Sequence, residues 1–233
     1  LLIFRKRRPS ANFSIEASFD EMSSAFDGRG ELELKPHVSS YISSGIRLRL
    51  AALMEVAKLR ADVFHVTGDV HFLTLALPGQ RSVLTLHDVG FLGRGRTVLW
   101  RWIVKKLWLD WPVKHCALVT TVSEATRADV LRITRCPPEK VIVIPTVIRA
   151  SFTFSHKIFD TQCPTVLHIG FAPNKNFFRH VEALAGLRCK LIAVGRMSDE
   201  HRAHLAKHGV ECESLENLTD QEMRRAYERS DIV

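Results

Sequence analysis

The chain has 233 residues, of which 46% are hydrophobic and 25% are charged, and its formal net charge is +8. This composition is typical of a globular protein, and it excludes a disordered chain, a collagen and a coiled coil. No apolar run approaches the roughly 20 residues that a membrane-spanning helix needs. The positive charge favours anionic partners such as phosphates, nucleotides or acidic lipids.

The first part of the chain alternates apolar strand segments with segments of helical period. One clear helix signal is the apolar face of Ile15, Phe19, Met22 and Phe26. Ser123 is placed to cap a later helix. The expected strands cover 1–4, 31–34, 62–66, 82–87, 117–122 and 141–144, and the expected helices cover 15–26, 44–60, 70–77, 97–115 and 124–133.

The segment 146–164 has no clear period, which indicates a linker, and the alternation begins again at 165. Thr219 and Glu222 have the spacing of a capping box. Further expected strands cover 165–169, 190–194, 210–215 and 231–233, and further helices cover 176–187, 198–208 and 219–230. The two blocks predict an α/β fold with a parallel-sheet domain at 1–145 and an incomplete second one at 165–233.

Open parallel sheets bind ligands beyond the carboxyl ends of their strands, so residues directly after strands are the first candidates. The strongest is the segment 170–176, where backbone N–H groups, a helix N-terminus and Lys175 together favour a phosphate. A departing diphosphate needs this combination, because its negative charge grows as its bond breaks. The spacing is not that of a Walker loop, and an ordinary turn with an exposed lysine is the alternative.

Polar residues also follow two strands of the first block. His87 can donate to a reacting oxygen or a sugar hydroxyl, and the alternative is a histidine satisfied by backbone groups. Thr67, Gly68 and Asp69 are expected to form a turn that hydrogen-bonds a substrate.

A metal-dependent hydrolase is a second hypothesis, with His65, His71, His87 and Asp88 as ligands. No H-E-x-x-H pattern supports it.

A third hypothesis is a non-enzymatic basic module that docks on anionic membranes through the tryptophan-rich segment 100–111. The alternative for this segment is a helix packed on the sheet. Its packed face would consist of Trp100, Val104, Leu107, Trp108 and Trp111.

Several motifs occur in a shared order along nearly the whole chain. They are Phe13-Ser14-Ile15-Glu16, the segment 62–71, Thr85-Leu86-His87-Asp88, Val122-Ser123-Glu124-Ala125-Thr126, Val143-Ile144-Pro145, Ile169-Gly170, Pro173-Asn174-Lys175-Asn176 and Leu218-Thr219-Asp220-Gln221-Glu222-Met223. In these motifs the chain resembles glycosyltransferase family 4, the retaining, nucleotide-sugar-dependent enzymes with the GT-B fold.

The resemblance implies two Rossmann-like parallel-sheet domains, the first for the acceptor and the second for the nucleotide-sugar, with the reaction in the cleft between them. It implies transfer of a hexosyl unit to an acceptor hydroxyl with retention, in surface polysaccharide or glycan biosynthesis. His87 matches the active-site histidine of the family, near the donor sugar. The implied diphosphate site consists of Gly170, Asn174, Lys175 and Asn176.

The acceptor side of the implied cleft contains Thr67, Gly68, Asp69, Asp88, Ser123 and Glu124. The implied partners are a nucleotide-sugar donor and a glycan or lipid-linked acceptor, with no cofactor, no metal and no nucleic acid. The five cysteines are widely spaced, as is typical of reduced thiols, so we expect a cytoplasmic protein. Peripheral contact with the inner face of an anionic membrane is a further expectation.

The sequence departs from the family pattern at three places. Thr146-Val147 stands where the family usually has Asn-Gly, and Phe171 stands where a small hydroxyl residue is common. The E-x7-E motif of the family would lie beyond Val233, where this sequence ends. We therefore expect a fragment of a longer enzyme that lacks activity by itself.

Overall fold

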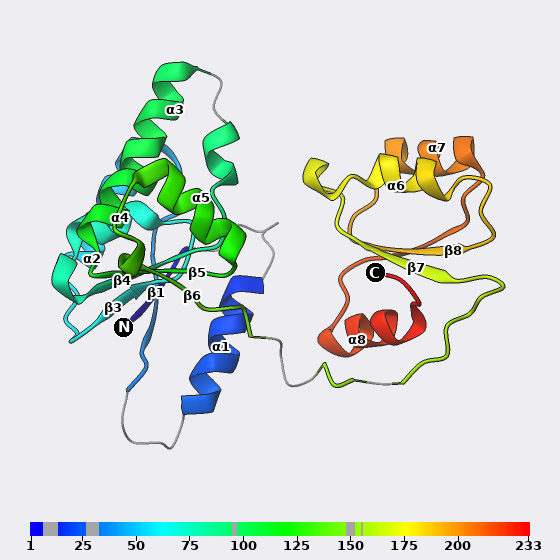
Figure 1. The fold of residues 1–233 in the computed structure, drawn as a ribbon, viewed down its shortest axis with the longest axis horizontal. Helices are drawn as coiled ribbons and strands as arrows, with labels where there is room; N and C mark the ends of the chain where they lie inside the picture. The colour runs from blue at the N-terminus through cyan, green and yellow to red at the C-terminus, as the bar shows by residue number, and fades with distance from the viewer. Residues whose placement is uncertain (7–13, 27–32, 95–96, 148–151, 155) are drawn as a thin grey trace. The chain divides into compact units, whose positions relative to one another are not determined.

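The structure is a computed structural model, and it describes residues 1–6, 14–26, 33–94, 97–147, 152–154 and 156–233. The chain divides into two compact units, Leu1–Ala150 and Ser151–Val233 (Figure 1). The described residues of the predicted linker, 146–164, contain no helix or strand. Each unit is built around its own parallel sheet, which confirms the predicted fold class.

The first unit contains a six-stranded sheet in the order β2-β1-β3-β4-β5-β6, and all its neighbouring strands are parallel. The strands are β1 (Leu2–Phe4), β2 (Pro36–Val38), β3 (Phe64–Val66), β4 (Ser82–Leu86), β5 (Leu118–Thr121) and β6 (Val141–Val143). The α-helices are α1 (Ser14–Phe26), α2 (Gly45–Val56), α3 (Val98–Val104), α4 (Trp111–His115) and α5 (Glu124–Thr134). Short helices of other types are η1 (His71–Ala76), η2 (Gly79–Arg81), η3 (Gly90–Arg94), η4 (Lys105–Asp110) and η5 (Pro138–Lys140).

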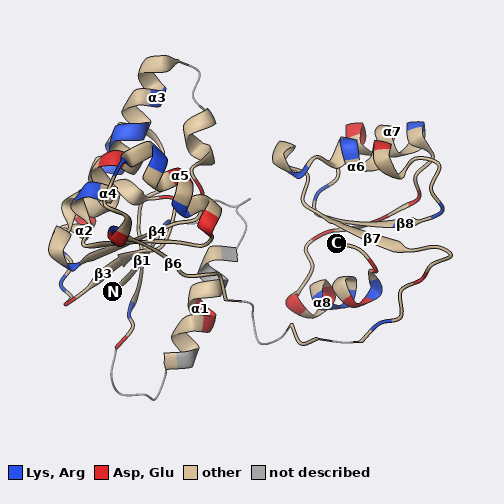
Figure 2. Ribbon diagram, in the orientation of Figure 1, with Lys and Arg blue, Asp and Glu red and all other residues tan. Residues whose placement is uncertain are grey.

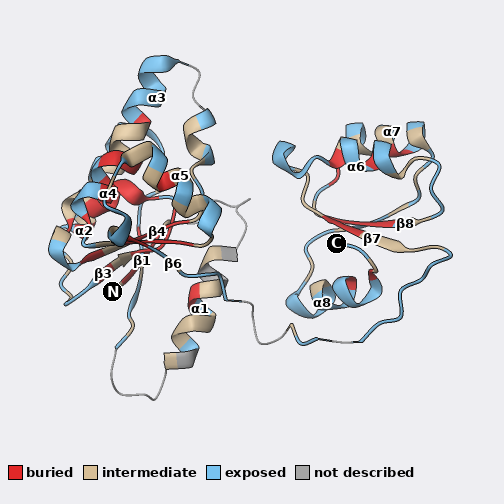
Figure 3. Cartoon of the chain, viewed as in Figure 1, coloured by how far each residue is buried: buried red, intermediate tan, exposed pale blue. Residues whose placement is uncertain are grey.

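Alternation along β1 explains how its two faces are covered. Leu2 and Phe4 point to one face and pack with Phe19 of α1. Ile3 points to the other face, into the main core, which contains residues of α2, η1, η4, α4 and α5. Figure 3 shows that buried residues concentrate in the strands and in the helix surfaces that cover them.

The second strand differs from the sequence-based expectation. Alternation of Leu32 and Leu34 predicts a strand at 31–34, but the observed strand is Pro36–Val38. Residues 31 and 32 lie outside the described residues, as does Phe13 of the first motif. The strand lies at the sheet edge, where a proline is tolerated and burial imposes little alternation.

The tryptophan-rich segment is also not the single α-helix that its period predicts. Between α3 and α4 the chain forms a π-helix at Lys105–Asp110. Its wider turn rotates the later side chains relative to an α-helix, so Leu109 is buried and Trp111 is exposed. The predicted packed face is wrong for Trp111 for this reason. Trp100, which lies before the π-helix in α3, is also exposed, whereas Val104 is buried as expected.

The second unit contains a three-stranded parallel sheet in the order β7-β8-β9. Its elements are β7 (Thr165–Ile169), η6 (Pro173–Lys175), α6 (Phe177–Leu184), β8 (Lys190–Val194), α7 (Asp199–His208), β9 (Cys212–Leu215) and α8 (Asp220–Arg229). Helices α6 and α7 cover one face and α8 covers the other (Figure 1). The last predicted strand is a single bridge between Val166 and Ile232.

Two predicted helix caps are confirmed. The Ser123 hydroxyl accepts a hydrogen bond from the Thr126 amide at 3.2 Å. Thr219 and Glu222 form the capping box at the start of α8. Both caps satisfy backbone donors that the first turn of a helix leaves without partners.

Candidate functional site

His87 lies at the carboxyl end of β4, where it is partly buried. Its Nε2 lies 2.8 Å from the carbonyl oxygen of Thr67, which follows β3. A carbonyl oxygen only accepts, so the Nε2–H of His87 donates this hydrogen bond. The His87 ring also lies beside Gly68, where an added Cβ would be 3.6 Å from two of its atoms. The structure therefore brings these three predicted residues together.

Thr67 connects neighbouring strands through hydrogen bonds of its side chain and backbone. It is 1% exposed, and its hydroxyl donates to the carbonyl oxygen of Ile3 at 3.0 Å. Because its carbonyl accepts from His87, Thr67 joins the ends of β1, β3 and β4. Its side chain is thus already occupied inside the sheet.

Asp69 lines a cavity of about 510 Å³. Its carboxylate forms an ion pair with Arg5, the residue directly after β1. Arg5 and Lys6 both line this cavity. The guanidinium of Arg49 lies 4.6 Å from the ring centroid of Trp108, which also lines the cavity. Basic and aromatic groups therefore converge on one hollow of the first unit.

Arg5 and Lys6 are not among the candidate residues selected from the sequence, so this basic lining was missed. The missed signal is their position directly after a parallel strand, which is the rule that selects Asp69 and His87. The partner of Arg5 could not be read from the sequence, since Asp69 is 64 positions away.

The other predicted acceptor residues have local structural partners. Asp88 accepts a hydrogen bond from the Gly90 amide at 2.7 Å. Ser123 caps α5, and the hydroxyl of Thr126 in that helix lies 3.3 Å from the carbonyl oxygen of His87. Glu124 is exposed in the first turn of the same helix. These residues surround the β4 end without sharing one ligand cavity with it in the described part of the chain.

The four proposed ligands of the hydrolase hypothesis do not form a metal-ligand cluster in the described residues. His65 lies within β3 and contacts the Thr85 hydroxyl at 2.7 Å. His71 is buried and contacts the Trp108 carbonyl oxygen at 2.9 Å. Burial lowers the pKa of both histidines to about 4. Both are therefore neutral, hydrogen-bonded parts of the interior.

The loop after β7 contains the predicted phosphate-binding segment of the second unit. Gly170 has φ +84°. A Cβ built on it would lie 3.7 Å from Cγ and 3.8 Å from Cε of Lys175. The lysine side chain thus runs along the glycine backbone, with its residue exposed to solvent. Asn176 adopts the left-handed conformation, φ 54°, and turns the chain into α6.

The N-terminus of α6 has no side-chain cap, unlike the two later helices of this unit. Ser198 and Thr219 occupy the first-turn donors of α7 and α8. Among the described residues, no side chain caps the first-turn amides of α6, and Lys175 lies two positions before this helix. Free amides, the helix dipole and a lysine together form a site that favours an anion.

Phe171, the bulky departure from the family pattern, packs onto the core of the second unit. Its ring centroid lies 4.8 Å from that of Phe177 and 4.8 Å from that of His201. Gly195 makes this position available, because a Cβ there would lie 3.2 Å from the Phe171 ring. The Phe171 ring is therefore held by its contacts with Phe177 and His201.

His168 holds the loop from inside the sheet. Its Nε2 lies 2.8 Å from the Gly170 carbonyl oxygen, and its Nδ1 lies 3.0 Å from Nδ1 of His180. Burial lowers the pKa of His168, and the positive charge of Lys175 acts in the same direction. The neutral ring therefore donates from Nε2 and fixes the backbone at Gly170.

Within the described residues, no helix is both long and apolar enough to cross a membrane.

Comparison with solved structures gives the same fold. HepE (Alr3699) of Anabaena, solved with UDP and glucose, is 12% identical with a TM-score of 0.61, and the match covers 94% of this chain and 70% of that protein. MnaA of S. aureus, solved with UDP, is 13% identical with a TM-score of 0.63, and the match covers 98% of this chain and 71% of that protein. No curated protein sequence matches the chain.

The sequence profile of Glycosyltransferase Family 4 matches residues 22–152, which is more than half of the chain. The matched region includes the β3 and β4 ends with His87 and Asp69. The protein is thus a member of glycosyltransferase family 4, a transferase with the GT-B fold.

Proposed function

We propose that this protein binds a nucleoside diphosphate sugar through the Gly170 loop and transfers the sugar to an acceptor hydroxyl. The observation that carries this proposal is Lys175, which lies along Gly170 next to the uncapped N-terminus of α6. UDP in the solved structures of HepE and MnaA supports UDP as the nucleotide.

In the proposed reaction the acceptor oxygen forms a bond with the anomeric carbon of the sugar. The bond from that carbon to the diphosphate oxygen breaks, the diphosphate leaves with the electron pair, and the proton of the acceptor hydroxyl passes to the departing diphosphate oxygen. Lys175 and the α6 amides stabilise the charge that develops on the departing oxygen. We propose that these groups make a metal at the diphosphate unnecessary, with Asn174 and Asn176 completing the site.

We propose that the acceptor binds to the first unit, in the cavity lined by Arg5, Lys6, Asp69 and Trp108. Aromatic walls with a few convergent polar groups are typical of ligand cavities. A glycan or a lipid-linked glycan fits this lining. We propose that His87 positions the donor sugar. The proposed product is a hexosyl linkage with retained configuration. We propose that it is made in the cytoplasm, for a surface polysaccharide or another glycan.

Changing Lys175 to alanine tests the proposed diphosphate site. We expect Lys175→Ala to weaken UDP binding about tenfold or more, because a charge-assisted hydrogen bond contributes about 1.5–3 kcal/mol. UMP lacks the second phosphate, so the unaltered protein should prefer UDP to UMP and the variant should lose most of this preference. Isothermal titration calorimetry with both nucleotides measures this.

Lys190 supplies the matched control. It is an exposed lysine at the amino end of β8, and the Gly170 loop lies at the carboxyl ends of the strands of the same sheet. Lys190→Ala should bind UDP as the unaltered protein does. Equal UDP affinity in Lys175→Ala and the unaltered protein would contradict the assignment of the site.

We further propose that α3 contacts an anionic membrane. Val98, Leu99 and Trp102 are 84%, 68% and 56% exposed on this one helix. Basic residues lie on α3 and in the π-helix after it (Figure 2), and the Lys106 ammonium lies 6.0 Å from the Trp102 ring centroid. Exposed aromatic and aliphatic groups beside cations are typical of helices that lie in a membrane interface.

A paired substitution on α3 tests this contact. We expect Leu99→Ser with Trp102→Ser to reduce co-sedimentation with phosphatidylglycerol vesicles several-fold, because the inserted apolar surface is lost. The control is Phe154→Ser with Leu187→Ser, which removes two exposed apolar residues of the second unit. Equal loss in both pairs would contradict a specific role of α3.

A further inference from the structure

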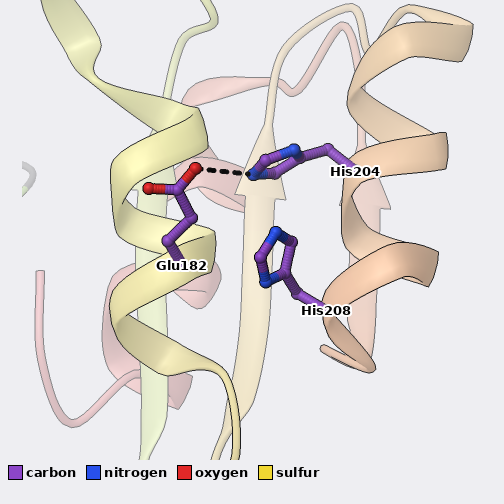
Figure 4. A group of neighbouring side chains, drawn as sticks. All are labelled: Glu182, His204 and His208. Carbon is purple, nitrogen blue, oxygen red and sulfur yellow. Dashed lines mark ion pairs between the residues drawn. The ribbon is translucent and has the colours of Figure 1, made fainter.

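Glu182, His204 and His208 form a cluster of metal-ligand type outside the phosphate loop (Figure 4). Each side chain offers one ligand atom, and these atoms all lie within 4.8 Å of one another. Glu182 comes from α6, and the two histidines lie four residues apart on one side of α7. The cluster therefore links the two helices that cover one face of the sheet.

The distance between two of the ligand atoms is close to that expected around a bound zinc ion. Nε2 of His204 lies 3.6 Å from Oε1 of Glu182. Ligand atoms 2.0–2.2 Å from a tetrahedral zinc lie roughly 3.3–3.6 Å from one another. The ring centroids of His204 and His208 are 4.5 Å apart. Nε2 of His204 also lies 3.2 Å from the Phe178 carbonyl oxygen, a contact that it would exchange for the ion.

The backbone positions of these ligands are held by the core. Val181, next to Glu182, and Leu205, next to His204, are buried in the same apolar cluster. Because packing fixes both helices, the three side chains are already close to one another before an ion binds. Binding therefore costs little conformational entropy.

His208 carries an independent signal. Its Nε2 is buried and has no hydrogen-bond partner among the described residues. A buried polar atom without a partner costs stability, and metal ligation at the ring would offset that cost. Glu182 is largely exposed, so an ion can reach the group from solvent.

We propose that Glu182, His204 and His208 bind a divalent transition metal, with water as a fourth ligand, and that the ion joins α6 to α7. Two imidazoles and one carboxylate favour zinc over magnesium or calcium. The site is separate from the diphosphate site, because Glu182 lies in the last turn of α6 and Lys175 lies before its first turn. The proposal does not depend on the transfer reaction.

The test uses the whole folded chain after its accessible cysteines have been alkylated with N-ethylmaleimide, so that their thiolates cannot bind the metal. Competition against a chromogenic zinc chelator should give one zinc per chain, and zinc should raise the midpoint of thermal unfolding where magnesium does not. Cobalt(II) in the same site should show ligand-field bands without thiolate charge transfer. Absence of zinc binding in the unaltered chain would overturn the proposal.

The variants separate this site from adventitious binding. His208→Ala and Glu182→Gln should each weaken zinc binding at least about tenfold, since even residues that only support a ligand change affinity by this much. Glu182 is exposed, so Glu182→Gln keeps the fold even where His208→Ala does not. His156→Ala, which changes an exposed histidine outside the cluster, should bind as before. Unchanged affinity in both His208→Ala and Glu182→Gln would contradict the assignment.

Discussion

Gly170→Val should weaken UDP binding by about a hundredfold or more. The backbone at Gly170 has φ +84°, a conformation that costs a side-chain-bearing residue about 1–3 kcal/mol. The valine methyl groups would also enter the volume now occupied by Cγ and Cε of Lys175. Relief of either conflict moves the backbone or the lysine, so both parts of the proposed phosphate site are lost together.

Gly186 supplies the matched control for this result. It has φ +75° in the same unit, and nothing lies within 4 Å of a Cβ built on it. Gly186→Val therefore carries a similar backbone strain away from the loop. We expect both variants to lose stability in urea unfolding and only Gly170→Val to lose UDP affinity in calorimetry. A similar loss of affinity in both would mean that strain in the unit, and not the loop, determines binding.

The first unit should become less stable as the pH falls from 7 to 5. Burial lowers the pKa of His65 and His71 from 6.5 to about 4. The unfolded chain therefore binds more protons between these values, so the stability that is present above pH 6.5 is lost as the pH falls towards 4. The loss is about 2 kcal/mol for each histidine by pH 5.

Tryptophan fluorescence reports on this unit alone, because all four tryptophans lie between residues 100 and 111. Urea unfolding at pH 7 and pH 5 measures the change in the free energy of unfolding. His71→Phe should show a smaller change with pH by about 2 kcal/mol, because the variant has one buried titrating group fewer. His156→Phe, at an exposed position, should change with pH as the unaltered protein does. Identical pH dependence in His71→Phe and the unaltered protein would contradict the role of His71.

Much of the candidate site could be predicted from the sequence because its parts follow strands. The rule that ligands bind beyond strand ends selects Gly170, Lys175 and His87 without knowledge of any contact. The placement of Phe171 could not be predicted, since it depends on Gly195, at the end of the neighbouring strand β8, leaving room for the ring. The assignment of Thr67 to the acceptor could not take into account that its hydroxyl reaches Ile3.

The sequence by itself determined the order of strands and helices, their alternating burial and the caps at Ser123 and Thr219. These features depend on interactions within a few residues, which local patterns record directly. Only the tertiary structure decided the π-helix, the ion pair of Arg5 with Asp69 and the cluster of Glu182 with His204 and His208. The π-helix depends on how its side chains pack against the core. The ion pair and the cluster depend on partners that are distant in sequence and meet only when the core brings their backbones together.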